Sequence, residues 1–113
     1  MTRYLISFPS AAMDVPEEGG PDVARDAHAV IQEARDAGVY IFSGGLDEGV
    51  KPVLVSCDGT VTDDTYREFK ELSGGFAIID APSREAALDW AAKIAVACRC
   101  SQEVREFQFD PLV

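Results

Sequence analysis

The spacing of apolar residues predicts a strand followed by a helix in the first part of the chain. Apolar and less apolar positions alternate over residues 4–8, which predicts a strand that begins almost at residue 1 and ends at Pro9. Over residues 23–34 the apolar positions recur at helical spacing, so a helix is expected up to about Ala37. Gly38 suits the position after the helix, because glycine readily adopts a positive φ.

The middle of the chain predicts a strand and then a hairpin. Residues 39–42 form a second apolar strand, and residues 52–57 form a third. Asp58 and Gly59 follow directly and predict a type I′ turn, which needs two positive φ angles. The return strand is expected over residues 60–62.

The last part of the chain repeats the strand–helix–strand order. The apolar run over residues 75–81 predicts a strand buried on both faces. Ser83 is a suitable N-cap for the next helix, because its hydroxyl can accept a bond from the first helical turn. Alternation over residues 103–109 predicts the final strand. The apolar residues expected on one face of this helix are Ala87, Trp90, Ala91, Ile94 and Cys98.

This order of elements is typical of the split βαβ, or ferredoxin-like, α+β fold. It predicts one domain over residues 1–113, with an antiparallel sheet and both helices on one face. The other face of the sheet then needs a cover, which two sheets packed face to face would supply. The residues expected to line that face are Tyr4, Ile6, Phe42 and either Ile78 or Ile79.

Composition and charge narrow the range of partners. Ten Lys and Arg against 20 Asp and Glu give a net charge of −10, which argues against nucleic-acid phosphates and anionic membranes. Three cysteines without regular spacing make a poor disulfide framework and favour a reduced, cytoplasmic location. No signal peptide and no membrane span is expected from the apolar runs.

Several motifs together resemble one known family. The segment Asp63-Asp-Thr-Tyr-Arg-Glu-Phe-Lys-Glu71 resembles the Asp-Gly-Pro-Phe signature region of the YCII-related, or DGPF-domain, proteins. Asp64 and Thr65 replace the Gly-Pro of that signature. The Gly-Gly-Phe at residues 74–76 and the Glu-Val-Arg at residues 103–105 resemble flanking motifs of the same family.

The resemblance implies a dimeric α+β barrel, in which two ferredoxin-like protomers join through their sheets. It implies a protein of unassigned activity that binds a small organic ligand in a cleft between sheet and helices. If the protein is an enzyme, the expected chemistry is that of a cofactor-free lyase or isomerase. The alternative is a non-catalytic dimer that regulates a protein partner, for example a transcription factor. No cofactor is expected.

His28, the only histidine, is the candidate catalytic residue. A histidine in this helix resembles one that some YCII-related proteins pair with an acidic residue. Imidazole exchanges protons near neutral pH, so general acid–base work is the functional interpretation. The alternative is a solvated residue on the flank of a surface helix.

Four further residues are candidates for ligand binding. Asp63, Tyr66 and Lys70 lie in a charged segment over residues 63–74, expected to be a loop or short helix, which either binds a polar substrate or attaches itself to the sheet. Arg105 either meets a carboxylate ligand or pairs with an acidic residue of a neighbouring strand or of a second protomer. No metal site is expected, because the Cys98-Arg-Cys100 spacing is too short for a structural zinc pair.

Overall fold

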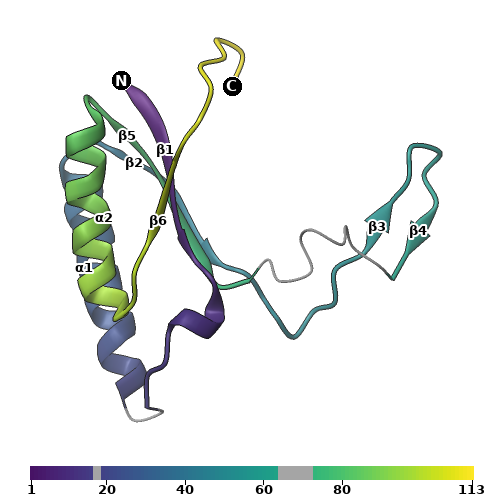
Figure 1. The fold of residues 1–113 in the computed structure, drawn as a ribbon, viewed down its shortest axis with the longest axis horizontal. Coiled ribbons are helices and arrows are strands. Elements are labelled where there is room, and N and C mark those ends of the chain that lie inside the picture. The colour runs from purple at the N-terminus through teal and green to yellow at the C-terminus, as the bar shows by residue number, and fades with distance from the viewer. Residues whose placement is uncertain (17–18, 64–72) are drawn as a thin grey trace.

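The computed structural model describes residues 1–16, 19–63 and 73–113 of the chain, whose fold is drawn in Figure 1. β2, β5, β1 and β6 form an antiparallel sheet in that order, and α1 and α2 cover the same face of it (Figure 1). The expected ferredoxin-like α+β fold is therefore confirmed. In chain order the elements are β1 (Thr2–Phe8), a short helical turn η1 (Ser10–Ala12), α1 (Gly20–Asp36), β2 (Tyr40–Gly45), β3 (Leu54–Val55), β4 (Val61–Thr62), β5 (Gly75–Ala81), α2 (Arg84–Cys98) and β6 (Glu103–Glu106).

The core lies between the sheet and the helices. Tyr4 and Ile6 of β1 and Ile79 of β5 are buried there in one cluster with Ala87 and Ala91 of α2. The expectation that Tyr4 and Ile6 line the uncovered face of the sheet is therefore wrong. A period of two separates the faces of a strand, but it does not say which face the helices cover.

The face of the sheet that turns away from the helices is only half-buried. Leu5 pairs with Ile78, and residues paired across strands share a face, so both lie opposite the core. Phe42 pairs with Ile78 and is 52% exposed. β5 alternates between buried and half-buried residues, so the prediction that it is buried on both faces is wrong. We call this surface the open face, and its apolar members are Leu5, Ile41, Phe42, Phe76, Ile78 and Phe107.

The helix boundaries follow the sequence signals. α1 ends at Asp36, and Gly38 has a φ of 75°, as expected for the residue that closes a helix. Ser83 is the N-cap of α2, and its Oγ accepts a hydrogen bond from the Ala86 amide at 3.1 Å. Both predicted helix ends are confirmed.

Two ion pairs join α1 to α2. Arg99 follows α2 and donates from Nη2 to Asp26 Oδ2 of α1 at 2.8 Å, while Lys93 Nζ lies 3.6 Å from Glu33 Oε1. The Arg99 guanidinium holds the pKa of the Asp26 carboxyl below its usual value. Arg99 has a φ of 62°, and its guanidinium also donates to the Ala97 carbonyl at 2.6 Å. These contacts fix the two helices relative to each other on the sheet.

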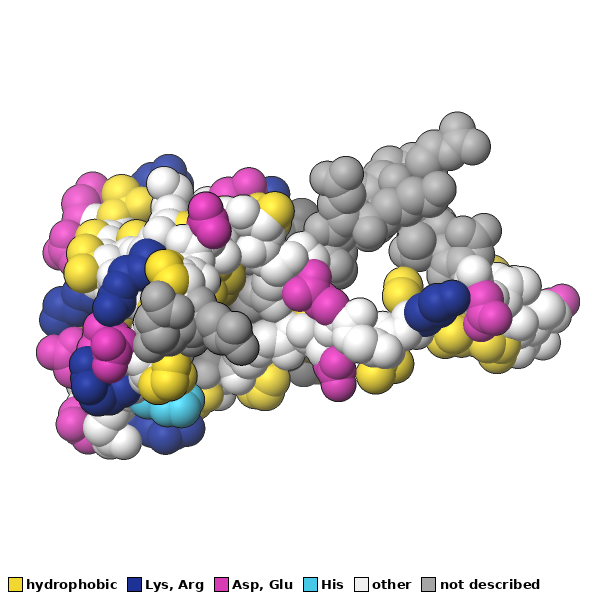
Figure 2. Space-filling view, turned by 90° about the horizontal axis from the view of Figure 1, so that it is seen from below, with side chains coloured by type: hydrophobic (Ala, Val, Ile, Leu, Met, Phe, Trp, Pro, Cys, Tyr) yellow, Lys and Arg dark blue, Asp and Glu magenta, His cyan; other side chains and the backbone are white. Residues whose placement is uncertain are grey.

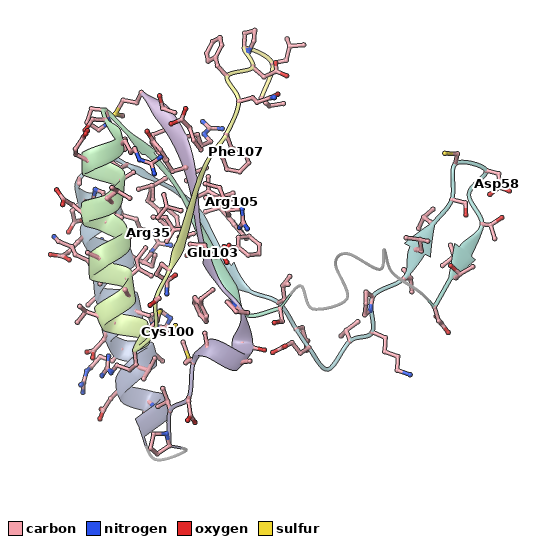
Figure 3. The ribbon with its side chains drawn as sticks, viewed as in Figure 1. Arg35, Asp58, Cys100, Glu103, Arg105 and Phe107 are labelled. Carbon is pink, nitrogen blue, oxygen red and sulfur yellow. The ribbon has the colours of Figure 1, made fainter. Side chains whose placement is uncertain are left out.

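Residues 46–63, which we call the arm, lead away from the body of the protein and carry the hairpin of β3 and β4 (Figure 1). Hydrophobic and charged side chains are both exposed along it (Figure 2), and Asp58 lies at its far end (Figure 3). The predicted type I′ turn is wrong, because Gly59 has a positive φ of 89° but Asp58 does not. The Gly59 amide donates to the Ser56 carbonyl at 2.9 Å, which is a type I turn followed by a glycine in the left-handed region.

Candidate functional site

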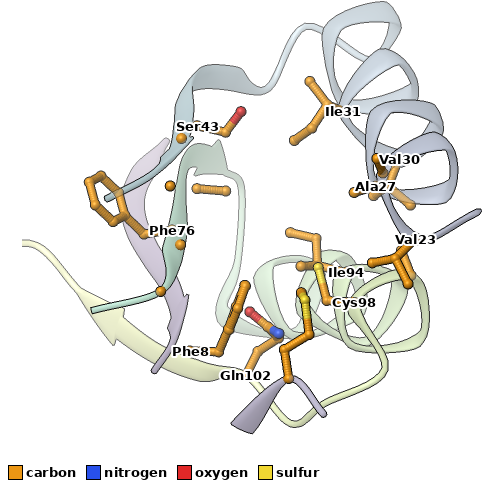
Figure 4. A pocket seen from close by; sticks show the side chains of 18 of the residues that line it. Phe8, Val23, Ala27, Val30, Ile31, Ser43, Phe76, Ile94, Cys98 and Gln102 are labelled. Carbon is orange, nitrogen blue, oxygen red and sulfur yellow. The ribbon is translucent and has the colours of Figure 1, made fainter. Parts of the chain in front are cut away.

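A cavity of about 550 Å³ lies between the helical face of the sheet and the two helices (Figure 4). Its volume falls within the range of small-molecule binding sites. The sheet contributes Ile6, Phe8 and Ala77 to its walls, and α2 contributes Ile94, Ala97 and Cys98. α1 contributes Val23, Ala24, Ala27, His28, Val30 and Ile31.

Small residues at one end of the sheet leave this space unfilled. Gly44 and Gly45 end β2, Gly74 and Gly75 stand at the start of β5, and all four line the cavity. Gly45 pairs with Gly75, so neither strand can project a side chain between sheet and helix there. The pairing of Gly45 with Gly75 therefore enlarges the cavity.

Gly74 holds one rim of the cavity close to β1. Its φ is 81°, and a Cβ added to it would lie 2.1 Å from the Phe8 carbonyl oxygen and 2.8 Å from the Ser10 nitrogen. Only glycine fits this conformation and this approach. The close contact lets the Ser73 hydroxyl accept a hydrogen bond from the Ser10 amide at 3.1 Å.

A few polar groups reach an otherwise apolar wall. Ser43 Oγ shares a hydrogen bond of 3.0 Å with the Tyr40 hydroxyl, which lowers the pKa of Tyr40. Gln102 donates from Nε2 to the Cys100 carbonyl at 3.3 Å, so its amide oxygen is left to serve as an acceptor. Among the described residues that line the cavity there is no Asp, Glu, Lys or Arg.

Cys98 faces the cavity as a buried thiol (Figure 4). Burial raises the pKa of its thiol, and the neighbouring Cys100 raises it further. A thiol held in the protonated form is a poor nucleophile, so Cys98 contributes to the wall as a small apolar group.

His28 lies on the wall that α1 supplies, and its side chain is exposed. Asp26, the nearest acidic residue along α1, is already paired with Arg99 and Arg25. Within the described part of the chain, no hydrogen bond or ion pair fixes the imidazole. The catalytic role expected of His28 stays a prediction.

The other candidate residues do not meet His28 in the described structure. Arg105 pairs with Leu5, which places it on the open face, across the sheet from the cavity. Its Nη2 lies 2.6 Å from Glu103 Oε2 of its own strand, and Figure 3 shows the two residues together. Asp63 follows β4 at the end of the arm. Tyr66 and Lys70 lie outside the described residues.

Sequence reasoning missed Ser43 and Gln102, two polar residues of the cavity wall. Neither belongs to a motif, and each becomes a site residue only because its strand or loop ends beside α1 or α2. The available signal was the Gly-Gly sequence at residues 44–45 and again at residues 74–75. Glycines at the same end of two adjacent strands leave a gap under a covering helix.

The described residues lack two features that would point to a membrane or a metal ion. No helix there is long and apolar enough to cross a membrane. Across residues 1–16, 19–63 and 73–113, no three side chains of His, Cys, Asp or Glu lie close enough together to hold a metal ion.

Comparison with known families gives one match. The profile of the YCII-related domain matches residues 14–108, which is most of the chain. No curated protein matches the chain.

Proposed function

The chain belongs to the YCII-related family, and from this premise we propose that it binds a small, uncharged and largely apolar organic molecule in the cavity between sheet and helices. The observation that carries the proposal is a cavity of about 550 Å³ whose described lining has no Asp, Glu, Lys or Arg.

Electrostatics favour an uncharged ligand. Moving an ionised group from water into an apolar site costs several kcal/mol unless an opposite charge compensates. Arg105, the cation that was expected to meet a carboxylate, lies on the other face of the sheet and is paired with Glu103. A neutral ligand with one or two polar atoms avoids this cost and can use Ser43 and Gln102 to fix its orientation.

The chemistry that these residues support is proton transfer without a cofactor, as in a lyase or an isomerase. His28 supplies an imidazole to the cavity wall, and imidazole is the commonest general acid–base group in enzymes. It would take a proton from one carbon of the ligand and return it to another, or to a leaving group. A His28→Gln variant should then bind the ligand as before but lose turnover.

We further propose that the protein is a homodimer in which the open faces of two copies pack together. Phe42 and Phe107 are 52% and 42% exposed, and Ile41 is 41% exposed. An exposed apolar surface of this kind marks an interaction site in soluble proteins. The same surface favours the alternative function, a regulatory module that binds a different protein.

A thermal-shift screen tests the ligand proposal. Uncharged aromatic amides and the matching carboxylates are compared at equal concentration, because a ligand that binds only the folded state raises Tm by mass action. We expect the amides to raise Tm and the carboxylates to leave it unchanged.

A matched pair of variants tests whether the ligand that raises Tm binds in the cavity. Ala27→Phe fills the space next to His28, whereas Ala29→Phe places the same ring on the exposed side of α1. The Tm shift should vanish in the first variant and persist in the second. Equal shifts in both variants, or a response to carboxylates alone, contradict the proposal.

A further inference from the structure

We propose that the arm of each protomer contacts the body of a second copy, with its valine face against the apolar edge of the partner's open face. The valine face consists of Val53, Val55 and Val61. This inference rests on the proposed homodimer and adds a reciprocal exchange of arms to it.

The pairing of β3 with β4 is too short to keep the hairpin of the arm stable by itself. Its two strands have two residues each, and an isolated two-stranded hairpin is at best marginally stable in water. Val55 pairs with Val61 across the strands, and alternation puts Val53 on the same face. These three side chains are 52–62% exposed, so they form an apolar face without a cover in the described structure.

The described part of the arm's own body does not supply that cover. The root of the arm is attached, because the Leu46 amide donates to the Gly74 carbonyl at 2.8 Å and Ser10 Oγ donates to Glu48 Oε1 at 2.8 Å. Beyond Gly49, the hydrogen bonds found within the described arm stay inside it. The hairpin therefore projects from the body, as Figure 1 shows.

The open face alone is small for a stable dimer. Four strands about 4.8 Å apart, of which the longest are about 23 Å long, give a footprint of at most roughly 450 Å² per protomer, whereas stable interfaces bury about 800 Å² per partner. The arm can make up the difference, because its 11 residue steps from Leu46 to Cys57 reach up to about 36 Å, more than the length of the sheet.

A second copy is the occupant that covers both apolar surfaces at once. In the part of the chain that the structure describes, the valine face and the open face both lack a cover, and the arm points away from its own sheet. If a two-fold axis brings the valine face of one copy to the open face of the other, it also brings the open face of the first copy to the valine face of the second. Two arms and two open faces then cover each other, so that neither of these two apolar surfaces is left uncovered.

The first test is the dimer dissociation constant measured by analytical ultracentrifugation. The variant Val55→Lys/Val61→Lys charges the valine face, and Thr60→Lys/Thr62→Lys adds the same charge to the other face of the hairpin. We expect the valine variant to weaken the dimer at least tenfold and the threonine variant to leave it within about twofold. Equal constants for both variants and the unchanged chain overturn the proposal.

A second measurement does not depend on those variants. Cys57 is exposed near the tip of the arm, Cys98 is buried, and Cys100→Ser leaves Cys57 as the accessible thiol for a spin label. Spin-labelled chains at natural isotope abundance are mixed with ¹⁵N-labelled chains that carry no spin label. We expect broadening of amide signals on the open face of the ¹⁵N-labelled copies.

The outcomes separate this proposal from the proposed function. A dimer without broadening between copies overturns the exchange of arms but keeps the dimer of open faces. A monomer at all concentrations overturns both assemblies, while the thermal-shift screen still decides the ligand proposal independently.

Discussion

Replacing Gly74 by alanine tests whether the close approach between β5 and β1 holds the rim of the cavity. The added methyl group would lie 2.1 Å from the Phe8 carbonyl oxygen and 2.8 Å from the Ser10 nitrogen, at a φ of 81°. A left-handed conformation costs an alanine about 1–2 kcal/mol. Overpacking against atoms that cannot move freely costs a further 1–3 kcal/mol or so. We therefore expect Gly74→Ala to lower the free energy of unfolding by about 3–4 kcal/mol.

Two other glycines isolate the steric part of that loss. Gly38 has a similar φ of 75° but nothing within 4 Å of an added Cβ, so Gly38→Ala should cost about 1 kcal/mol. Gly20 has neither a positive φ nor a close neighbour, so Gly20→Ala should cost nothing.

Urea unfolding measures all three variants on one scale. A domain of this size has a stability of about 5–15 kcal/mol, and with an m-value of about 2 kcal/mol/M, Gly74→Ala should lower the midpoint by about 1.5–2 M. The reasoning is refuted if Gly74→Ala costs no more than Gly38→Ala, because the contact with Phe8 would then have no steric consequence.

Two further predictions concern the helices. Asp26 has a pKa lowered by Arg99, so its ion pair contributes stability above the unfolded pKa of about 3.9 and loses it as the pH falls through the folded pKa. Thermal unfolding from pH 7 to pH 2 should therefore show the Asp26→Asn variant converging on the unchanged protein below about pH 4, and a constant difference would contradict the assignment. Ser83→Ala removes the hydroxyl that accepts from Ala86 and should cost about 1 kcal/mol in urea unfolding, whereas Ser83→Asp should restore most of it.

The order of the elements and the ends of the helices could be predicted because local chemistry decides them. Gly38 closes α1 through its positive φ, and Ser83 caps α2 through its hydroxyl, and both signals are readable from neighbouring residues. The type of the hairpin turn could not be predicted in this way. Asp58-Gly59 is compatible with two kinds of turn, and the pairing of the strands selects between them.

The faces of the sheet and the cavity depend on packing that the sequence does not state. Alternation in β1 separates Tyr4 and Ile6 from Leu5, but only the position of the helices decides which set is buried. The predicted set of polar site residues was spread over the whole chain, and the register places Arg105 across the sheet from His28. The cavity arises in part from the absence of side chains at Gly45 and Gly75, which pair with each other on the helical face of the sheet.

The central claim is that the cavity accepts small uncharged molecules, and methyl NMR tests it most directly. Alanine methyl groups of Ala24, Ala27 and Ala97 line the cavity, whereas Ala29 and Ala92 are exposed on the same two helices. Titration with benzamide should shift the first three signals in a saturable manner and leave the other two in place. Benzoate at the same concentrations should shift none of them. If benzamide shifts no cavity methyl group, or if benzoate shifts them equally, the account of the site is wrong.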